Sequence, residues 1–178
     1  MSSEKEEIIK RINNNEIIAL PTDTVFALVA KLNKKNISKI NKLKNRDVDQ
    51  PIQILFSSLR EATIAFEEDY FVMNYLSNNF KDKTSYLLKA KDEFNNQYLT
   101  KGYNRKVLIR IPKGKIVDVL KETGPLLATS TNIHNEKPMV DNDEIRTKFN
   151  IFVSKEKQLN NKSSKIISII NSEIEEIR

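Results

Sequence analysis

Apolar residues recur every three or four positions in several parts of the chain, and this spacing predicts amphipathic helices. The first predicted helix covers residues 3–13, where Ile8, Ile9 and Ile12 share one face. The last one begins at Asp141, a residue type that often caps a helix. Between these two, helices are predicted over residues 34–45, 69–79 and 115–121.

Short apolar runs lie between and after these helices, and they predict buried strands. The runs cover residues 16–20, 52–56, 86–89, 107–111, 126–128, 151–153, 166–170 and 174–177. Because strands alternate with helices, the sequence predicts an α/β fold in which helices flank a sheet.

Length and composition limit the class of protein. The 178 residues, 39% of them hydrophobic, predict one domain over residues 1–178 with its own core. No apolar run reaches the roughly 18 residues of a membrane span, and the charged N-terminus lacks a signal-peptide core. We therefore expect a soluble cytoplasmic protein with no membrane contact.

Several kinds of site are excluded by what the chain lacks. The chain has no cysteine, so disulfides and a cysteine nucleophile are impossible. Because it also has only one histidine, a zinc site is not expected, and we predict no metal site built by the protein. The chain has only three glycines and no Gly-x-Gly-x-x-Gly, which excludes a dinucleotide fingerprint and a P-loop. A serine nucleophile is improbable because Gly-x-Ser-x-Gly is missing, and His134 is interpreted as a loop residue.

The net charge of +6 is concentrated in one segment that contains no acidic residue. Its basic residues are Lys31, Lys34, Lys35, Lys39, Lys42, Lys44 and Arg46. Such a patch attracts nucleotides or RNA. Lysine is abundant throughout the chain, however, so a solvated face is an equally good interpretation.

Polar residues that could bind a ligand follow three of the predicted elements. Thr22, Asp23 and Thr24 come directly after a strand, although this composition is also typical of a turn. Lys44 and Arg46 end a helix, where they could clamp a phosphate or complement the helix dipole.

Two further candidates lie in the second half of the chain. Arg110 sits among apolar residues of a strand, so it either has a carboxylate or phosphate partner or faces solvent. Ser130, Thr131 and Asn132 follow an apolar run and are suited to ligand recognition.

Taken together, these stretches resemble the YrdC family of threonylcarbamoyl-adenylate synthases, in particular the stand-alone bacterial type called TsaC. The family pattern runs Pro-Thr-Glu-Thr-x-Tyr-Gly, Lys-x-Arg-Pro-x-x-x-Pro, Val-Arg-x-Pro and Ser-Thr-Ser-Ala-Asn. The matching stretches, in the same order, are residues 21–27 (Pro-Thr-Asp-Thr-Val-Phe-Ala), 44–51 (Lys-Asn-Arg-Asp to Pro), 109–112 (Ile-Arg-Ile-Pro) and 128–132 (Ala-Thr-Ser-Thr-Asn). Residues 164–167 resemble a late Ser-Thr-hydrophobic element of the family.

The resemblance implies a twisted mixed sheet, flanked by helices, around a basic concave cavity. It also implies a nucleotidyltransferase that makes threonylcarbamoyl-AMP and pyrophosphate from L-threonine, bicarbonate or CO2, and ATP. The product would be used by partner proteins that transfer the threonylcarbamoyl group to tRNA. Mg²⁺ is expected to accompany ATP, held mainly by phosphates and water.

The resemblance also implies roles for individual residues. L-Threonine would contact Thr24, Arg110 and Ser130, with Arg110 on its carboxylate. Lys44 and Arg46 would be the catalytic residues and would hold the ATP phosphates. The other implied ATP-binding residues are Gln50, Asn132, Ser164 and Arg178.

The chain departs from the family pattern at several positions. Phe26 and Ala27 replace Tyr-Gly, Asp47 replaces the proline after Lys-x-Arg, and Thr131 replaces alanine. Of a Pro-Gly-Pro-x-Thr element only Thr84 is kept. The alternative hypothesis is a non-catalytic protein of the same fold that binds tRNA or rRNA through the basic segment.

Overall fold

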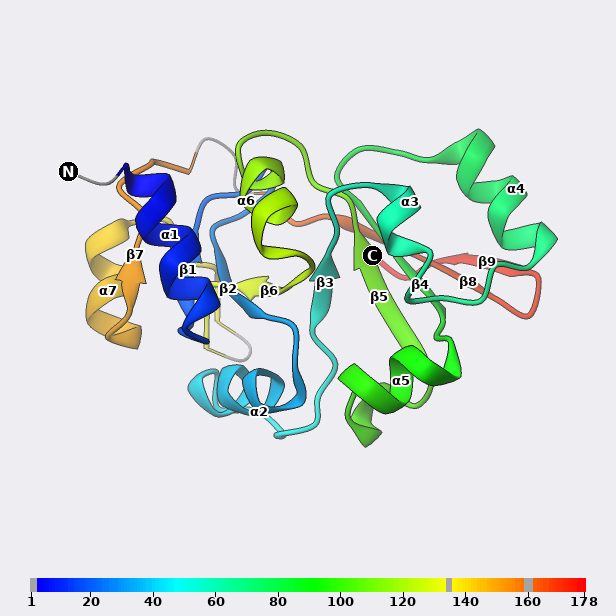
Figure 1. Cartoon of the computed structure of the whole chain (residues 1–178), viewed down its shortest axis with the longest axis horizontal. Coiled ribbons are helices and arrows are strands. Elements are labelled where there is room, and N and C mark those ends of the chain that lie inside the picture. The colour runs from blue at the N-terminus through cyan, green and yellow to red at the C-terminus, as the bar shows by residue number, and fades with distance from the viewer. Residues whose placement is uncertain (1–2, 134–135, 159–161) are drawn as a thin grey trace.

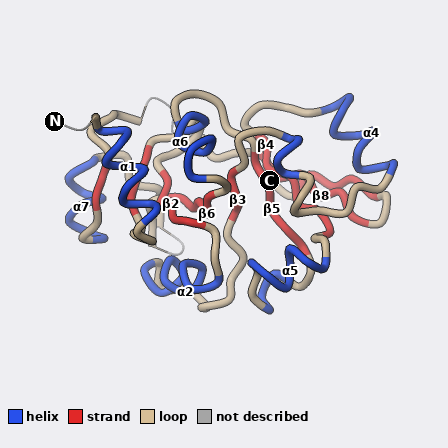
Figure 2. Tube along the Cα trace, in the orientation of Figure 1, coloured by secondary structure: helices blue, strands red, loops and turns tan. Residues whose placement is uncertain are grey.

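The computed structural model describes residues 3–133, 136–158 and 162–178, and its strands form one mixed sheet. The strand order is β7-β1-β2-β6-β3-β5-β4-β8-β9. Figure 2 shows the strands crossing the middle of the molecule with helices around them. The strands are β1 (Ile18–Leu20), β2 (Ala27–Lys31), β3 (Gln53–Leu55), β4 (Thr84–Lys89), β5 (Lys106–Arg110), β6 (Leu126–Ser130), β7 (Phe152–Val153), β8 (Lys165–Ile170) and β9 (Glu173–Glu176).

The described residues contain the five predicted helices, with ends close to their expected positions, and two further short helices. They are α1 (Glu4–Asn13), α2 (Lys34–Leu43), α3 (Leu59–Ala62), α4 (Tyr70–Asn79), α5 (Asp92–Tyr98), α6 (Ile116–Thr123) and α7 (Asn142–Phe149), with a 3-10 turn, η1 (Lys101–Tyr103). Ser3 and Glu6 cap α1 reciprocally, and the Asp141 side chain caps α7 as predicted. The predicted α/β fold is therefore confirmed.

One face of the sheet is covered by helices along most of its length. Ile37 and Ile40 of α2, with buried residues of α4 and α5, pack on the β3–β8 part, and α7 packs on β1 and β2. In strand β3 the side chain of Ile54 belongs to this core. Residues that alternate with it therefore point to the opposite face.

The opposite face is covered only over part of the sheet. Ile8 and Ile12 of α1 pack together with Val119 and Leu120 of α6 against β1, β2 and β6. In Figure 1 these two helices lie over β1, β2 and β6, and among the described residues none from β5 or β8 belongs to this cluster. This uneven coverage leaves room for a cavity on β3, β5 and β8.

The β8–β9 hairpin returns the C-terminal residues to this open face. Asn171 and Ser172 both have positive φ angles, 54° and 60°, as a two-residue hairpin turn requires. The backbone of Arg178 then pairs with Ile166, whose N–H donates to the Arg178 carbonyl at 2.8 Å. Arg178 is thereby placed beside the start of β8.

Several elements differ from the sequence-based expectation. The helix predicted over residues 34–45 ends at Leu43, with Lys44 as its C-cap and Arg46 beyond it. Strand β2 was not predicted, although its residues form an apolar run that is buried. Helices α3 and α5 were not predicted either, and in α5 only Phe94 is buried. Most strand boundaries shift by one or two residues.

The described residues contain no helix that is both long and apolar enough to cross a bilayer. His134, interpreted above as a loop residue, lies outside the described residues.

The close contact between Gly102 of η1 and the segment that follows α2 can be tested by mutation. A Cβ added at Gly102 would lie 1.7 Å from the Asp49 carbonyl oxygen, so Gly102→Ala must push the two segments apart. We expect a loss of about 3 kcal/mol in the free energy of unfolding, measured by urea denaturation. In the control Gly114→Ala no atom lies within 4 Å, and the positive φ of 83° alone costs about 1 kcal/mol. Equal losses in the two variants would contradict the close contact.

Candidate functional site

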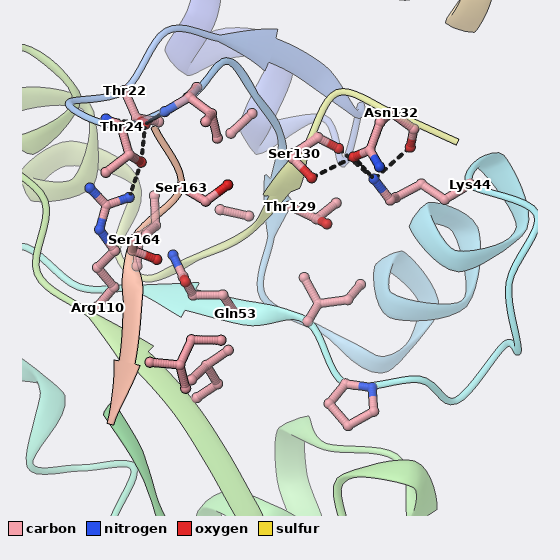
Figure 3. A pocket seen from close by; sticks show the side chains of 18 of the residues that line it. Thr22, Thr24, Lys44, Gln53, Arg110, Thr129, Ser130, Asn132, Ser163 and Ser164 are labelled. Carbon is pink, nitrogen blue, oxygen red and sulfur yellow. Dashed lines mark hydrogen bonds between the residues drawn. The ribbon is translucent and has the colours of Figure 1, made fainter. Parts of the chain in front are cut away.

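A cavity of about 380 Å³ occupies the open face of the sheet. Side chains from β2, β3, β5 and β6 line it, together with the loops after β1 and α2 and the segment that enters β8. Figure 3 shows Thr22, Thr24 and Arg110 at one end and Lys44, Ser130 and Asn132 at the other. The volume lies within the range of small-molecule sites, roughly 300–1,000 Å³.

Every residue to which the family resemblance assigns a role lines this cavity, whereas the candidates Asp23 and Thr131 do not. The residues with an implied role are Thr24, Lys44, Arg46, Gln50, Arg110, Ser130, Asn132, Ser164 and Arg178. They come from segments up to 154 residues apart, between Thr24 and Arg178. The fold thus brings the candidates together, while their roles toward ligands stay predictions.

The loop after β1 is organised by the hydroxyl of Thr22. Thr22 Oγ1 accepts from the backbone N–H of Thr24 and of Val25, each at 3.2 Å, and donates to the Val25 carbonyl at 2.7 Å. It also lies 3.1 Å from Thr24 Oγ1. The segment is therefore a turn, as its composition suggested, and the turn also forms a cavity wall.

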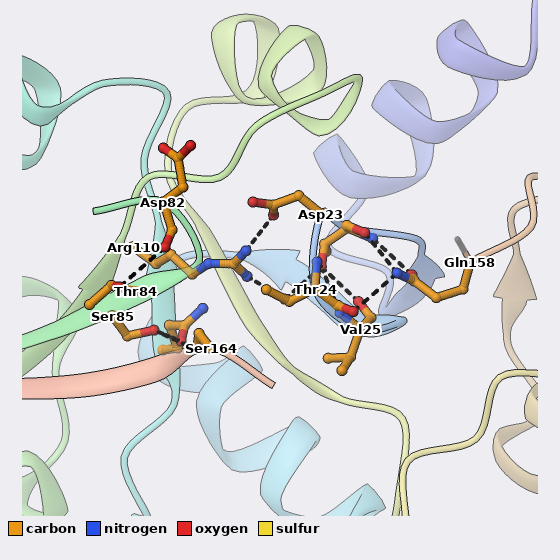
Figure 4. Close-up of polar contacts among 11 residues, drawn as sticks. Asp23, Thr24, Val25, Asp82, Thr84, Ser85, Arg110, Gln158 and Ser164 are labelled. Atoms are coloured by element: carbon orange, nitrogen blue, oxygen red, sulfur yellow. Dashed lines mark hydrogen bonds and ion pairs between the residues drawn. The ribbon is translucent and has the colours of Figure 1, made fainter. Parts of the chain in front are cut away.

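A second support for this loop comes from Gln158. Its Oε1 accepts from the Thr22 N–H at 3.1 Å, and its Nε2 donates to the Thr22 carbonyl at 2.8 Å and to the Thr24 carbonyl at 3.3 Å. Figure 4 shows the amide facing the loop from the side opposite Arg110. The side-chain amide of Gln158 thus pairs with backbone groups of this loop, as a neighbouring strand would.

Arg110 is buried at the end of β5, with 3% of its surface exposed. Its Nη2 forms an ion pair with the Asp23 carboxylate, and its Nη1 donates to Thr24 Oγ1 at 2.7 Å. The interpretation with a carboxylate partner is confirmed, and the solvated-face alternative is wrong. Burial lowers the pKa of Arg110 and the Asp23 carboxylate raises it, but an arginine stays cationic throughout the working range of pH.

Lys44 is tied to the protein at the other end of the cavity. Its Nζ donates to the carbonyls of Ser130 at 2.5 Å and Asn132 at 2.6 Å, and to Asn132 Oδ1 at 3.0 Å. All three ammonium donors are therefore used within the protein. In this state Lys44 holds the Ser130–Asn132 turn and has no donor left for a phosphate.

Arg46 differs from Lys44 because part of its guanidinium remains available. Its Nε donates to Asn41 Oδ1 at 2.6 Å, whereas its Nη2 is buried without a partner among the described residues. Burial lowers the pKa of Arg46, although the group stays charged. The basic segment is consequently not one continuous surface, since Lys44 is buried and Arg46 faces the cavity.

The floor of the cavity contains a chain of hydroxyl groups that ends on an amide. Ser164 Oγ and Ser85 Oγ lie 2.8 Å apart, and Ser85 Oγ donates to Gln53 Oε1 at 2.6 Å. Arg178 Nε donates to the Ser164 carbonyl at 3.1 Å. Gln53 and Ser163 also line the cavity (Figure 3), so a ligand would meet polar groups along this floor.

The sequence analysis missed several residues that build the site. Gln53 alternates with the core residue Ile54, a pattern that places it on the other face of the sheet once that strand is recognised. For Gln158 we find no sequence signal, because its partners are 134 and 136 residues away along the chain.

The charged residues that line the cavity all have the same sign. They are Lys44, Arg46, Arg110 and Arg178, and no aspartate or glutamate lines the cavity with them. Within the described part of the chain, no three His, Cys, Asp or Glu side chains converge to hold a metal ion. The site therefore favours an anionic ligand.

Comparison with known proteins agrees with this geometry. A Sua5/YciO/YrdC family model, with the description "Telomere recombination", matches residues 10–178. The chain belongs to the Sua5/YciO/YrdC family. The resemblance drawn from the sequence motifs is thereby confirmed.

Individual members of the Sua5/YciO/YrdC family are similar over most of this chain. A threonylcarbamoyl-AMP synthase of Buchnera aphidicola is 29% identical over 180 residues, which cover 92% of this chain and 97% of the relative. YciO of E. coli superposes with a TM-score of 0.84 at 19% identity, covering 98% of this chain and 87% of YciO. P. abyssi Sua5 complexed with L-threonine gives a TM-score of 0.77 at 19% identity, over 94% and 52% of the two chains. At these identities the two structures show the shared fold.

One departure from the family pattern has a structural explanation. Thr131, which replaces alanine, is fully buried; its Oγ1 donates to the Met139 carbonyl at 2.8 Å and lies 3.2 Å from the Phe26 carbonyl. Its hydroxyl thus ties two loops together away from the cavity. Phe26, in place of tyrosine, is also fully buried, and Ala27, in place of glycine, lines the cavity.

The environment of Lys44 leads to a prediction about pH. Burial and the positive charge of Arg46 lower the pKa of Lys44 from 10.5 to about 7. Between pH 7 and 10.5 the unfolded chain therefore binds the proton more readily, and this contribution to stability rises with pH. We expect the free energy of unfolding of the wild type minus that of Lys44→Met to increase from pH 7 to 10, by at most about 1.4 kcal/mol per pH unit.

Urea denaturation at several pH values measures this difference. Lys42→Met, at an exposed position of the same helix, is the matched control for the loss of a lysine. A Lys44→Met difference that stays constant or shrinks with rising pH would show that the three oxygen acceptors keep Lys44 protonated.

Proposed function

We propose that this protein is an L-threonylcarbamoyladenylate synthase, a nucleotidyltransferase that makes threonylcarbamoyl-AMP and pyrophosphate from L-threonine, bicarbonate or CO2, and ATP. The observation that carries the proposal is the cavity itself, whose charged lining is entirely cationic and which brings together all nine motif residues. The name of the Buchnera relative supports the same activity.

The end of the cavity formed by Thr24 and Arg110 suits L-threonine. Arg110 Nε is buried without a partner among the described residues, so one donor remains for the carboxylate of an amino acid. Thr24 Oγ1 and Ser130 Oγ add hydroxyl groups to the cavity wall. We assign these three residues to threonine binding.

The other end suits the phosphates of ATP. Arg46 lines this end and its Nη2 has no partner among the described residues, and Arg178 adds a second cation. Gln50, Asn132 and Ser164 would contact other parts of the nucleotide. Lys44 contributes its charge and holds the Ser130–Asn132 turn, so its direct contact with phosphate requires these bonds to be exchanged.

The chemistry needs no protein nucleophile. The threonine amine adds to CO2 and loses a proton to give a carbamate, whose oxygen then attacks the α-phosphorus of ATP. A bond from this oxygen to phosphorus forms while the bond to the pyrophosphate group breaks. The protein contributes by positioning both substrates and by stabilising negative charge on the phosphates.

Mg²⁺ would come with ATP, since the residues that line the cavity include no carboxylate to hold it. When bound, the ion neutralises phosphate charge. We also propose that the product passes to proteins that transfer the threonylcarbamoyl group to tRNA, and that residues 1–178 act as one domain in the cytoplasm.

The alternative, a non-catalytic RNA-binding protein, is less well supported. A protein that binds only a phosphate backbone would not require the buried Arg110–Thr24 contact or the Ser130–Asn132 turn. Salt-sensitive binding of tRNA without any turnover would favour this alternative.

The proposed activity can be measured with the purified full chain. ATP, bicarbonate and L-threonine are incubated with the protein, and pyrophosphate and threonylcarbamoyl-AMP are followed by enzyme-coupled absorbance and mass spectrometry. We expect both products to appear only when all three substrates are present. Pyrophosphate release that does not depend on threonine, or no release at all, would refute the proposed function.

Arg46→Ala should reduce turnover about 100-fold, because one positioned donor to developing charge contributes on that scale. Circular dichroism should show that the fold survives, since Arg46 is only half-buried at the cavity. Arg105→Ala removes an exposed arginine that pairs with Asp92, and it should retain wild-type activity. Full activity of Arg46→Ala would remove Arg46 from the phosphate role.

A further inference from the structure

Asn41 lies one turn before the cation pair and makes an unusual number of bonds to the loop that follows. It is fully buried in helix α2. Its Nδ2 donates to the carbonyls of Val48 at 2.9 Å and Gln50 at 2.8 Å, and its Oδ1 accepts from Arg46 Nε at 2.6 Å. Its backbone carbonyl also accepts from the Arg46 N–H at 3.1 Å.

These bonds fix both the backbone and the side chain of Arg46. With Nε held by Asn41, the guanidinium cannot turn about its stem without breaking a hydrogen bond. Its Nη2, buried and without a partner among the described residues, is then held at the cavity. An unpaired buried donor is costly unless a ligand completes it, so the arrangement is suited to an anionic oxygen.

The composition of the loop explains why such a tether is needed. The family pattern has proline directly after Lys-x-Arg, which would stiffen the backbone, whereas this chain has Asp47. Asp47 is exposed, and its main bond within the loop is from the Gln50 N–H to its carbonyl at 3.0 Å. Without the ring, the loop depends on hydrogen bonds for its shape.

The far end of the same loop is held from the other side. Tyr103 Oη accepts from the Ile52 N–H at 2.9 Å and donates to the Ile52 carbonyl at 3.0 Å. Among the described residues, Asn41 accepts both hydrogen bonds that Arg46 donates, whereas the bonds from Tyr103 lie six residues away along the chain.

We propose that Asn41 is a positioning residue of this site: it holds the Arg46 guanidinium so that Nη2 meets a phosphate oxygen of the bound nucleoside triphosphate. The nucleotide part of this inference rests on the proposed function. The general claim is a built oxyanion site whose affinity depends on Asn41 through Arg46.

A double-mutant cycle tests this dependence. ATP, and separately inorganic tripolyphosphate, are titrated calorimetrically into wild type, Asn41→Ala, Arg46→Ala and the double variant. We expect Asn41→Ala to weaken ATP binding roughly tenfold, as the loss of a bond to a charged group does. In the Arg46→Ala background, Asn41→Ala should alter ATP affinity less than about twofold, because Asn41 acts through Arg46. If the two residues acted independently, the losses of affinity would add.

Asn36→Ala is the matched control, because Asn36 is equally buried in the same helix and donates to the Lys31 carbonyl away from the cavity. It should lower stability without weakening ATP binding. If Asn41→Ala does not fold, Asn41→Asp replaces it in the cycle. That variant loses the two donated bonds and sets a carboxylate against Arg46, so ATP binding should weaken at least as much.

Three results would overturn the inference: ATP affinity unchanged in the Asn41 variant, an equal loss with and without Arg46, or no binding of either probe to the wild type. Its failure is distinguishable from failure of the proposed function. A wild type that binds ATP in this Asn41-dependent way but makes no threonylcarbamoyl-AMP would support the phosphate site and refute the synthase activity.

Discussion

The buried charge of Arg110 is the constraint on which the arrangement of the site depends. A guanidinium at the end of a central strand must have partners, because an unpaired buried charge is very costly. Asp23 and Thr24 supply them and thereby fix the loop after β1 against β5. Thr22 and Gln158 then hold this loop from behind, so hydrogen bonds within the protein fix this wall of the cavity.

The uneven distribution of helices gives that wall its cavity. Helices α1 and α6 cover one end of the sheet and stop short of β5 and β8, so polar side chains such as Gln53 replace apolar ones on the remaining part. Four cationic residues around this space create a field that attracts polyanionic substrates. In the absence of ligand, Asp23 partly neutralises one end, and a bound carboxylate would share Arg110 with it.

The two cations of the Lys-x-Arg motif are similar in sequence and different in structure. Lys44 turns inward and uses all its donors on the Ser130–Asn132 turn, whereas Arg46 lines the cavity and has a buried Nη2 without a partner among the described residues. The forked guanidinium of Arg46 has enough donors to bind Asn41 and a ligand at the same time. The ammonium group of Lys44 has three donors, and all of them are already in use. One residue therefore builds the site and the other is available to bind in it.

The sequence by itself determined the fold class and most helices, because hydrophobic periodicity is a local property of the chain. The set of residues that meet at the cavity was implied by the resemblance of its motifs to the family pattern. Helices α3 and α5 were not predicted because they are short and bury one residue each, and β2 was missed although its apolar run is buried. Only the tertiary structure decided between the alternatives for Arg110, separated Lys44 from Arg46, and identified Gln158 and Asn41 as supports. These outcomes depend on which groups share a low-dielectric interior and must satisfy one another's hydrogen bonds, and residues as far apart as Thr22 and Gln158 meet only when the chain is folded.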